Sequence, residues 1–396
     1  MMNLRQFPFP VLVTFAAVVP PSGCGCEDVK TTTDAELDGG HDVVFDGTID
    51  ASAQDAADVG SAPDACCAPG DGGLDGGDDD SGTDGGGDAG FADGGGCTPV
   101  PLGVPGTYQT EKLVTFVKVQ RGGSTYNVYV RQVRPKRTDH PGVCFPAVLK
   151  IPGGWGAGAP LIDQQDCAVM ASAGVVVTAF NPESRGSGEA RSDGPVPEDY
   201  NGYAHQDDCA AVVAALLSDS QVDMARVGVW SHSNGITIAS GCLNRHPELE
   251  VKFLMDEEGP HCPKELLADP DAQIDPALRD RWSQVLSEKV GPGLDYENED
   301  GFWAERCAVN QIGGVRASYQ RFQAEVDHAL GVYYHHTVAM NNTAVSGGVP
   351  WVRLNTNALG VVYGENDLSA PGVLLSGKLA DHQPELLSIF KELMER

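Results

Sequence analysis

Residues 226–235 read Arg-Val-Gly-Val-Trp-Ser-His-Ser-Asn-Gly and carry the most specific structural signal in the chain. Its mostly apolar first half, up to Trp230, predicts a short buried strand, and the residues from Ile236 to Arg245 predict a helix. The turn between them holds a serine with a small residue two positions before it and another two positions after it. In a strand–turn–helix of this kind the strand and the helix nearly touch at the flanking positions, and the central serine Oγ is lifted clear of the backbone. The stretch therefore predicts an accessible, nucleophilic serine at the end of a strand.

Two serines compete for the central position of this turn. With Ser231 in the centre, one flanking residue would be Val229, whose branched side chain does not fit a tight turn. With Ser233 in the centre, the flanking residues are Ser231 and Gly235, which are both small. We therefore predict that Ser233 is the nucleophile and that the backbone N–H of Asn234 donates to an oxyanion beside it. The alternative is a Ser/Asn/Gly turn without chemistry.

The first 23 residues are typical of an export signal. Residues 7–21 form an apolar run with Arg5 ahead of it, and this run is too short to span a membrane as a helix. The small residues before Cys24 resemble a bacterial lipoprotein processing site, where Cys24 would carry a lipid anchor; an ordinary cleaved signal is the alternative. We expect an exported protein, either a lipoprotein of the bacterial cell envelope or a secreted protein.

Residues 24–106 are expected to form a disordered acidic linker. Between Glu27 and Cys97 there are 19 acidic residues, one lysine and 17 glycines. Such a composition buries too little apolar surface to offset the entropy of ordering the chain. The linker carries 18 of the 30 net negative charges (19 minus one), and the domain beyond it has no basic patch of the kind that binds nucleic acid. We expect no nucleic-acid partner.

From Thr107 to Arg396 the patterns of strands and helices alternate. Alternating residues at 113–120 and 125–134, joined by Gly122-Gly123-Ser124, predict a hairpin. Further strands are expected at 147–151, 175–180, 226–230, 251–255, 319–324 and 351–354, and helices at 161–173, 205–217, 236–245, 333–344 and 384–395. This order predicts an α/β fold: a mostly parallel central sheet with helices on both faces and an antiparallel N-terminal hairpin at one edge.

Three stretches of this domain together resemble the α/β-hydrolase superfamily. Residues 223–235 resemble its nucleophile elbow and the lead into it, Pro152-Gly153-Gly154-Trp155-Gly156 is similar to its oxyanion loop with proline in place of histidine, and residues 181–188 are similar to its Arg-Gly-x-Gly loop. The chain is most similar to the dienelactone hydrolase, prolyl oligopeptidase and acetyl xylan esterase-like group. The resemblance covers residues 107–396 and implies a serine hydrolase with a lid-like insertion at about 260–316.

In such an enzyme a histidine takes the serine proton and a carboxylate holds the histidine, in the chain order serine, acid, histidine. His382 fits the base because it lies on a loop ahead of the predicted closing helix. Asp327 fits the acid because it follows the strand at 319–324 and leaves room for one helix and one strand before His382. Asp367 is the rival, but only fourteen residues separate it from His382.

The resemblance also predicts the surroundings of the reacting atoms. A backbone N–H near Gly154 and Trp155 is expected to complete the oxyanion hole with Asn234, because glycine lets the backbone approach a substrate. Trp155 also fits a pocket wall, and Arg185 is expected to pair with a carboxylate of the protein itself.

Six cysteines lie in the predicted domain, and an even number in an exported chain indicates disulfides, with fifteen possible pairings. They are Cys144, Cys167, Cys209, Cys242, Cys262 and Cys307, while Cys66, Cys67 and Cys97 lie in the linker. No pair has the spacing of a zinc finger, so we expect no metal, and the predicted chemistry needs no cofactor.

The sequence thus predicts an exported serine hydrolase that acts on a small-molecule or carbohydrate ester, as a carboxylesterase or a deacetylating esterase. One alternative is a serine peptidase of the prolyl oligopeptidase type. The other is a non-catalytic binding domain on the same scaffold, because a fold does not by itself determine a function.

Overall fold

The computed structural model describes residues 97–154, 156–195, 198–264, 279–280, 283–284 and 300–396. All of them belong to one compact unit, Asp50–Arg396. The predicted export signal, Cys24 and the linker up to residue 96 lie outside the described residues, as do Trp155 and much of the predicted insertion. None of the helices described is both long and apolar enough to cross a bilayer.

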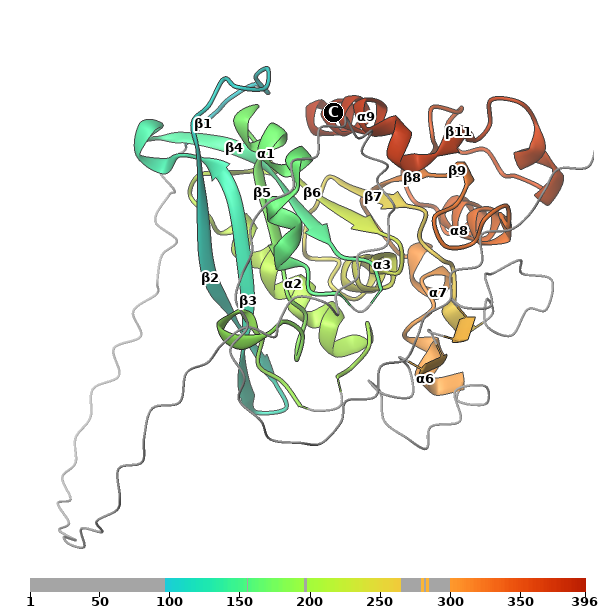
Figure 1. The fold of residues 1–396 in the computed structure, drawn as a ribbon, viewed down its shortest axis with the longest axis horizontal. Helices are drawn as coiled ribbons and strands as arrows, with labels where there is room; N and C mark the ends of the chain where they lie inside the picture. The colour runs from blue at the N-terminus through green and yellow to red at the C-terminus, as the bar shows by residue number, and fades with distance from the viewer. Residues whose placement is uncertain (1–96, 155, 196–197, 265–278, 281–282, 285–299) are drawn as a thin grey trace, which may run out of the picture. The chain divides into compact units, whose positions relative to one another are not determined.

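A mixed sheet forms the centre of the described part of the chain (Figure 1). Its strands lie in the order β10-β8-β7-β6-β4-β5-β3-β2, and β1 pairs with β4 beside this path. The strands are β1 Thr98–Pro99, β2 Thr110–Arg121, β3 Ser124–Pro135, β4 Val143–Ile151, β5 Val176–Phe180, β6 Val222–His232, β7 Phe253–Glu257, β8 Ser318–Phe322 and β10 Val352–Leu354. The hairpin β2–β3 joins β5 in the antiparallel sense, and the strands from β5 to β10 are parallel to one another. The predicted fold class is confirmed.

Helices cover both faces of this sheet because side chains of a strand point alternately to either side. Val229 of β6 packs in the core layer that includes residues of α2, α3 and α8, while its neighbour Trp230 packs in the layer with α1 and α9. The α-helices are α1 Gln165–Ser172, α2 Tyr203–Leu217, α3 Gly235–Arg245, α6 Asp300–Ala304, α7 Val309–Ile312, α8 His335–Ser346 and α9 Gln383–Glu395. Figure 1 shows α2 and α3 beside each other under the sheet and α9 near its other face.

The boundaries of several elements differ from the prediction. The expected helix at 161–173 begins as a 3-10 turn, η2 (Ala159–Asp163), before α1. The expected strand at 319–324 is interrupted after Phe322, and its continuation β9 (Ala324–Val326) pairs with β11 (Leu375–Lys378) in a separate two-stranded sheet. The remaining 3-10 turns are η1 Arg137–Asp139, η3 Gly188–Ala190, η4 Glu365–Ser369 and η5 Leu379–His382.

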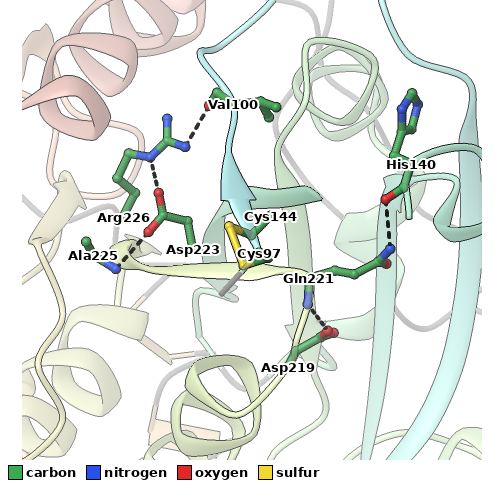
Figure 2. The surroundings of a disulfide bond; sticks show 9 residues. All are labelled: Cys97, Val100, His140, Cys144, Asp219, Gln221, Asp223, Ala225 and Arg226. Atoms are coloured by element: carbon green, nitrogen blue, oxygen red, sulfur yellow. Dashed lines mark hydrogen bonds and ion pairs between the residues drawn. A yellow bond between two sulfur atoms is a disulfide. The ribbon is translucent and has the colours of Figure 1, made fainter. Parts of the chain in front are cut away.

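A disulfide fastens the start of the described chain to the sheet. Cys97 is bonded to Cys144 at the beginning of β4, where β1 runs parallel to β4. Figure 2 shows Arg226 close by: its Nη2 donates to the carbonyl of Val100 at 2.6 Å, and its Nε donates to Asp223 at 2.6 Å. β1, which pairs with β4, therefore lies inside the stretch that the sequence predicted to be a linker.

The expectation that the six domain cysteines pair with one another is wrong. Cys144 pairs with Cys97 of the linker, and the other disulfide joins Cys262 to Cys307. The remaining cysteines of the described chain, Cys167, Cys209 and Cys242, are free thiols with no exposed surface. They pack between apolar side chains of the two core layers, so they contribute to the core as small apolar residues.

Candidate active site

Three neighbouring parallel strands end at the same level of the sheet. His232 of β6 lies opposite Glu257 of β7, which lies opposite Phe322 of β8. The next residue in each case continues the ladder: Ser233 N–H donates to the carbonyl of Glu257 at 2.8 Å, and Glu258 N–H donates to the carbonyl of Phe322 at 3.0 Å. Ser233 and Glu258 therefore stand side by side at the carboxyl edge of the sheet, where α/β proteins bind their ligands.

Ser233 has the backbone geometry that a nucleophile elbow requires. Its φ is +50°, in the left-handed region that a residue other than glycine seldom occupies. Close packing holds the turn in place: a Cβ on Gly153 would lie 2.8 Å from the Cβ of Ser233, and a Cβ on Gly235 would lie 2.5 Å from the carbonyl oxygen of Pro152. Small residues at these positions are therefore a steric requirement.

Ser231 is placed differently from Ser233. It is fully buried within β6, and its Oγ donates to the carbonyl of Met255 at 3.1 Å. Ser233 is only partly buried and follows the last residue of the strand. This difference supports the choice of Ser233 as the nucleophile.

The residues predicted to donate to the oxyanion adjoin Ser233 or its neighbour: Asn234 follows Ser233 in the chain, and Gly154 follows Gly153, which packs against Ser233. Asn234 stands at the N-terminus of α3, where backbone N–H groups lack intrahelical partners. Gly154 has φ +59°, and its carbonyl accepts from Arg185 Nη1 at 3.4 Å and from Asn201 Nδ2 at 3.3 Å. Arg185 is itself buried and paired with Glu198 at 3.2 Å, so the expectation of a structural ion pair is confirmed. Trp155 lies outside the described residues.

Asp327 is buried and takes part in a local hydrogen-bond network. Its Oδ1 accepts the backbone N–H groups of Ala329 at 2.8 Å and Leu330 at 2.9 Å. Its Oδ2 accepts from Gln323 Nε2 at 3.0 Å and lies 3.3 Å from His336 Nε2. Burial on its own would raise the pKa of Asp327, but the bonds from His336 and Gln323 and the neighbouring histidines hold that pKa well below its usual range.

His382 faces its own loop and the start of α9. Its Nδ1 lies 3.2 Å from Glu385 Oε2, and its Nε2 lies 2.7 Å from the carbonyl oxygen of Ser376. The structure therefore partners Asp327 with His336, and His382 with Glu385, and does not join Asp327 to His382. Asp367, the rival acid, accepts the N–H of Gly364 at 2.6 Å and thereby caps η4.

The structure instead brings together Glu258 and His328, which the sequence interpretation did not assign. Nδ1 of His328 lies 2.9 Å from Oε2 of Glu258, and the backbone N–H of His328 donates to the same oxygen at 3.2 Å. The other oxygen, Oε1, accepts the N–H of Ala324 at 3.1 Å. Glu258 is buried, whereas the His328 side chain is 35% exposed. The available signal in the sequence was a carboxylate three residues after each of two adjacent predicted strands, Glu258 and Asp327, with His328 beside the second.

Glu257 contacts a different histidine, His232. Its Oε1 accepts the indole N–H of Trp230 at 2.7 Å, and its Oε2 lies 3.2 Å from Nδ1 of the exposed His232. The ring of His232 packs against that of His328, with 4.8 Å between the ring centroids. The chain thus places the His328 ring against the residue that precedes Ser233.

Glu258, Asp327 and His328 are also the described residues whose spacing best suits a cation. One ligand atom from each lies within 4.8 Å of the others. However, both oxygens of Glu258 and both oxygens of Asp327 already accept N–H groups. We interpret the three residues as a hydrogen-bonded cluster.

No family model matches the chain, and no curated protein matches it. Among solved structures, dipeptidyl peptidase 4 of Porphyromonas gingivalis is 17% identical over 72% of this chain and 36% of its own, with a TM-score of 0.47. Acylaminoacyl peptidase of Pyrococcus horikoshii is 14% identical over 72% of this chain and 42% of its own, with a TM-score of 0.48. Acetyl xylan esterase 1 of a Thermoanaerobacterium species is 12% identical over 73% of this chain and 90% of its own, with a TM-score of 0.45.

The sheet order, the antiparallel hairpin at its edge and the turn at Ser233 match the predicted superfamily in architecture. The described strands and helices therefore have the α/β architecture that the sequence predicted. The chain spans well under half of the length of the two peptidases.

Proposed function

We propose that this protein is a serine hydrolase that cleaves ester bonds, with Ser233 as its nucleophile. The observation that carries the proposal is the strained backbone of Ser233 between β6 and α3, at φ +50°. Strain of this kind persists only where the surrounding structure imposes it, and it concentrates at functional sites. Gly153 packs against Ser233, and Asn234 stands at the N-terminus of α3, so backbone N–H groups of these two segments would be the donors that acyl transfer requires.

Ester hydrolysis in this site would proceed through an acyl-enzyme. The Oγ of Ser233 would attack the carbonyl carbon, and the N–H groups near Asn234 and Gly154 would stabilise the oxyanion. Water would then release the acid and restore the serine. We propose a carboxylesterase or a deacetylating esterase that is exported, either as a bacterial lipoprotein anchored at Cys24 or as a secreted protein.

The test is hydrolysis of a panel of p-nitrophenyl esters, acetylated sugars and short peptides by the wild-type protein, Ser233→Ala and Ser231→Ala. We expect turnover of at least one class of ester, a loss of about four decades in Ser233→Ala and a mild effect in Ser231→Ala. Turnover of peptides alone would favour the peptidase alternative. The absence of turnover on every substrate would favour the binding-domain alternative and contradict the proposal.

A further inference from the structure

We propose that His328 is the general base that activates Ser233 and that Glu258 is the carboxylate that orients it, in the roles that the sequence assigned to His382 and Asp327. This inference rests on the proposed function, because it names two catalytic residues of the same site. The residues come from the ends of three neighbouring strands: Ser233 follows β6, Glu258 follows β7 and His328 follows β8 and β9.

The ladder of the sheet places the first two residues. Ser233 donates its N–H to Glu257, the residue before Glu258, and adjacent strands run about 4.8 Å apart. A side chain bound to the Glu258 carboxylate is therefore within one side-chain length of the Ser233 turn. The ring of His328 is so bound, and it also packs on His232, the residue before Ser233.

The orientation of the ring fits the role of a base. The Glu258 carboxylate can only accept, so Nδ1 of His328 carries the hydrogen, and the neutral ring then has its lone pair on Nε2. Within the described residues, the hydrogen bonds of the His328 ring involve Nδ1 and none involves Nε2. The ring is also 35% exposed, so Nε2 is available to a serine and a substrate. The contrast is His382, whose two ring nitrogens both have protein partners.

Glu258 is held firmly enough to orient a base. Its φ is +50°, and the strain is held by hydrogen bonds from Glu258 N–H to Phe322 and from Ala324 N–H to its Oε1. The turn beyond it is fixed by Asp256, whose Oδ1 accepts the N–H of Gly259 at 3.0 Å. Asp256 is in turn fully buried and paired with Arg321 at 2.5 Å.

Asp327 then becomes a positioning residue. Its Oδ1 accepts the N–H groups of Ala329 and Leu330, and its backbone forms an antiparallel bridge with Gly331. These bonds fix the turn that carries His328. Asp327 therefore acts on the base through the backbone and through its charge, because its Oδ1 lies 3.6 Å from Nδ1 of His328, while Glu258 makes the closer contact with the ring at 2.9 Å.

The chemical step balances with water as the sole co-reactant. As the Oγ of Ser233 bonds to the ester carbonyl carbon, its proton moves to Nε2 of His328 and the carbonyl electron pair moves to the oxygen. Collapse of this intermediate breaks the bond to the alcohol, which takes the proton from Nε2. Water then attacks the acyl-enzyme, Nε2 again accepts and returns a proton, and the acid is released.

The experiment compares three asparagine variants of the full chain on p-nitrophenyl acetate. His328→Asn keeps a donor for Glu258 and removes Nε2, so we expect kcat/KM to fall by about three decades or more. His382→Asn tests the residue that the sequence assigned as base, and we expect a change of less than about tenfold. His246→Asn is the matched control, because His246 is also paired with carboxylates, Asp207 and Glu248, at the far end of α3.

Three further readouts keep the inference testable if a variant is unstable. Circular dichroism and the melting temperature show whether each variant folds, and His328→Ala should regain activity when imidazole is added, which a purely structural role would not allow.

Loss of activity in His382→Asn with retention in His328→Asn would overturn the inference while leaving the proposed function intact. Inactivation of the wild-type protein by EDTA, reversed by zinc, would also overturn it, because Glu258, Asp327 and His328 would then be metal ligands. Failure of the wild-type protein to turn over any ester would instead be a failure of the proposed function.

Discussion

Nδ1 of His328 lies 2.9 Å from Oε2 of Glu258, and this pair stands next to Ser233 at the carboxyl edge of three parallel strands. Asp327 immediately precedes His328, yet its carboxylate is occupied by Gln323, His336 and two backbone N–H groups. Two adjacent residues therefore have separate functions: one fixes the loop and the other presents an imidazole.

The first prediction compares two adjacent carboxylates with isosteric substitutions. Glu258→Gln should lower kcat on p-nitrophenyl acetate by roughly two to four decades, because an amide no longer stabilises the imidazolium that forms on His328. Glu257→Gln should have a much smaller effect, because Glu257 bonds to Trp230 and His232. Steady-state kinetics of the two variants, with melting curves as the check on folding, measure this. Equal losses in both variants would argue that Glu258 has no special role.

The second prediction concerns the dependence of activity on pH. Burial lowers the pKa of His328, but the hydrogen bond to Glu258 and the charges of Asp327, Glu258 and Glu257 outweigh it and raise that pKa above 6.5. The neighbouring His232 ring packs against the same imidazole. Since the neutral ring is the base, kcat/KM should fall by about tenfold per pH unit below a midpoint above 6.5. In Glu258→Gln the midpoint should move to lower pH. A wild-type midpoint well below 6.5 would contradict the assignment.

The third prediction concerns stability in acid. Burial lowers the pKa of His336 to about 4, although its bond to Asp327 opposes the shift and Arg321 and His261 reinforce it. His336 takes up a proton near pH 6.5 in the unfolded state but only near pH 4 in the folded state. Its contribution to the free energy of unfolding is therefore lost as the pH falls from 6.5 to 4, and it changes no further at lower pH. His336→Asn keeps a donor for Asp327 and removes the titration. Urea unfolding of both proteins at pH 7 and pH 4.5 should show the wild type losing up to about 3 kcal/mol more than the variant. An identical loss in both proteins would show that His336 does not titrate in this range.

The fourth prediction concerns the disulfide between Cys97 and Cys144. It closes a loop of 47 residues in the unfolded chain, so Cys97→Ser combined with Cys144→Ser should lower the free energy of unfolding by about 2–4 kcal/mol. Cys144 lies at the beginning of β4, whereas Ser233 follows the end of the parallel β6, so the kinetics should be unchanged. Urea unfolding and ester turnover test the two halves of this prediction. Detection of two free thiols at these positions in the native wild type would contradict it.

The sequence was sufficient for the fold and for the tight turn at Ser233 because both depend on local patterns. The small residues around Ser233 are required by contacts within the turn and with the Pro152 loop, so their spacing alone reveals the elbow. The acid and the base depend on which loops reach the site. The strand after β8 restarts as β9 and pairs with β11, and the β11 segment places the carbonyl of Ser376 against His382. Chain order carries no information about that long-range pairing, so the sequence could not indicate that the carboxylate of Glu258 and the ring of His328 would meet.

The disulfide between Cys97 and Cys144 could not be predicted from the sequence for a related reason. Composition marks the residues up to Cys97 as a linker, yet Thr98 and Pro99 add to the sheet beside β4 and bring Cys97 to Cys144. Two residues of parallel pairing are too short to leave a pattern in the sequence. The free thiols of Cys209 and Cys242 lie within the apolar faces of α2 and α3, where burial rather than pairing accounts for them.

Reaction with a fluorophosphonate probe, followed by mass spectrometry of the labelled peptides, shows directly whether Ser233 is a nucleophile. We expect a single label on Ser233 of the native wild-type protein, the same label in Ser231→Ala, and no label in Ser233→Ala or after denaturation. A label on Ser231, or no label on the folded wild-type protein, would contradict it.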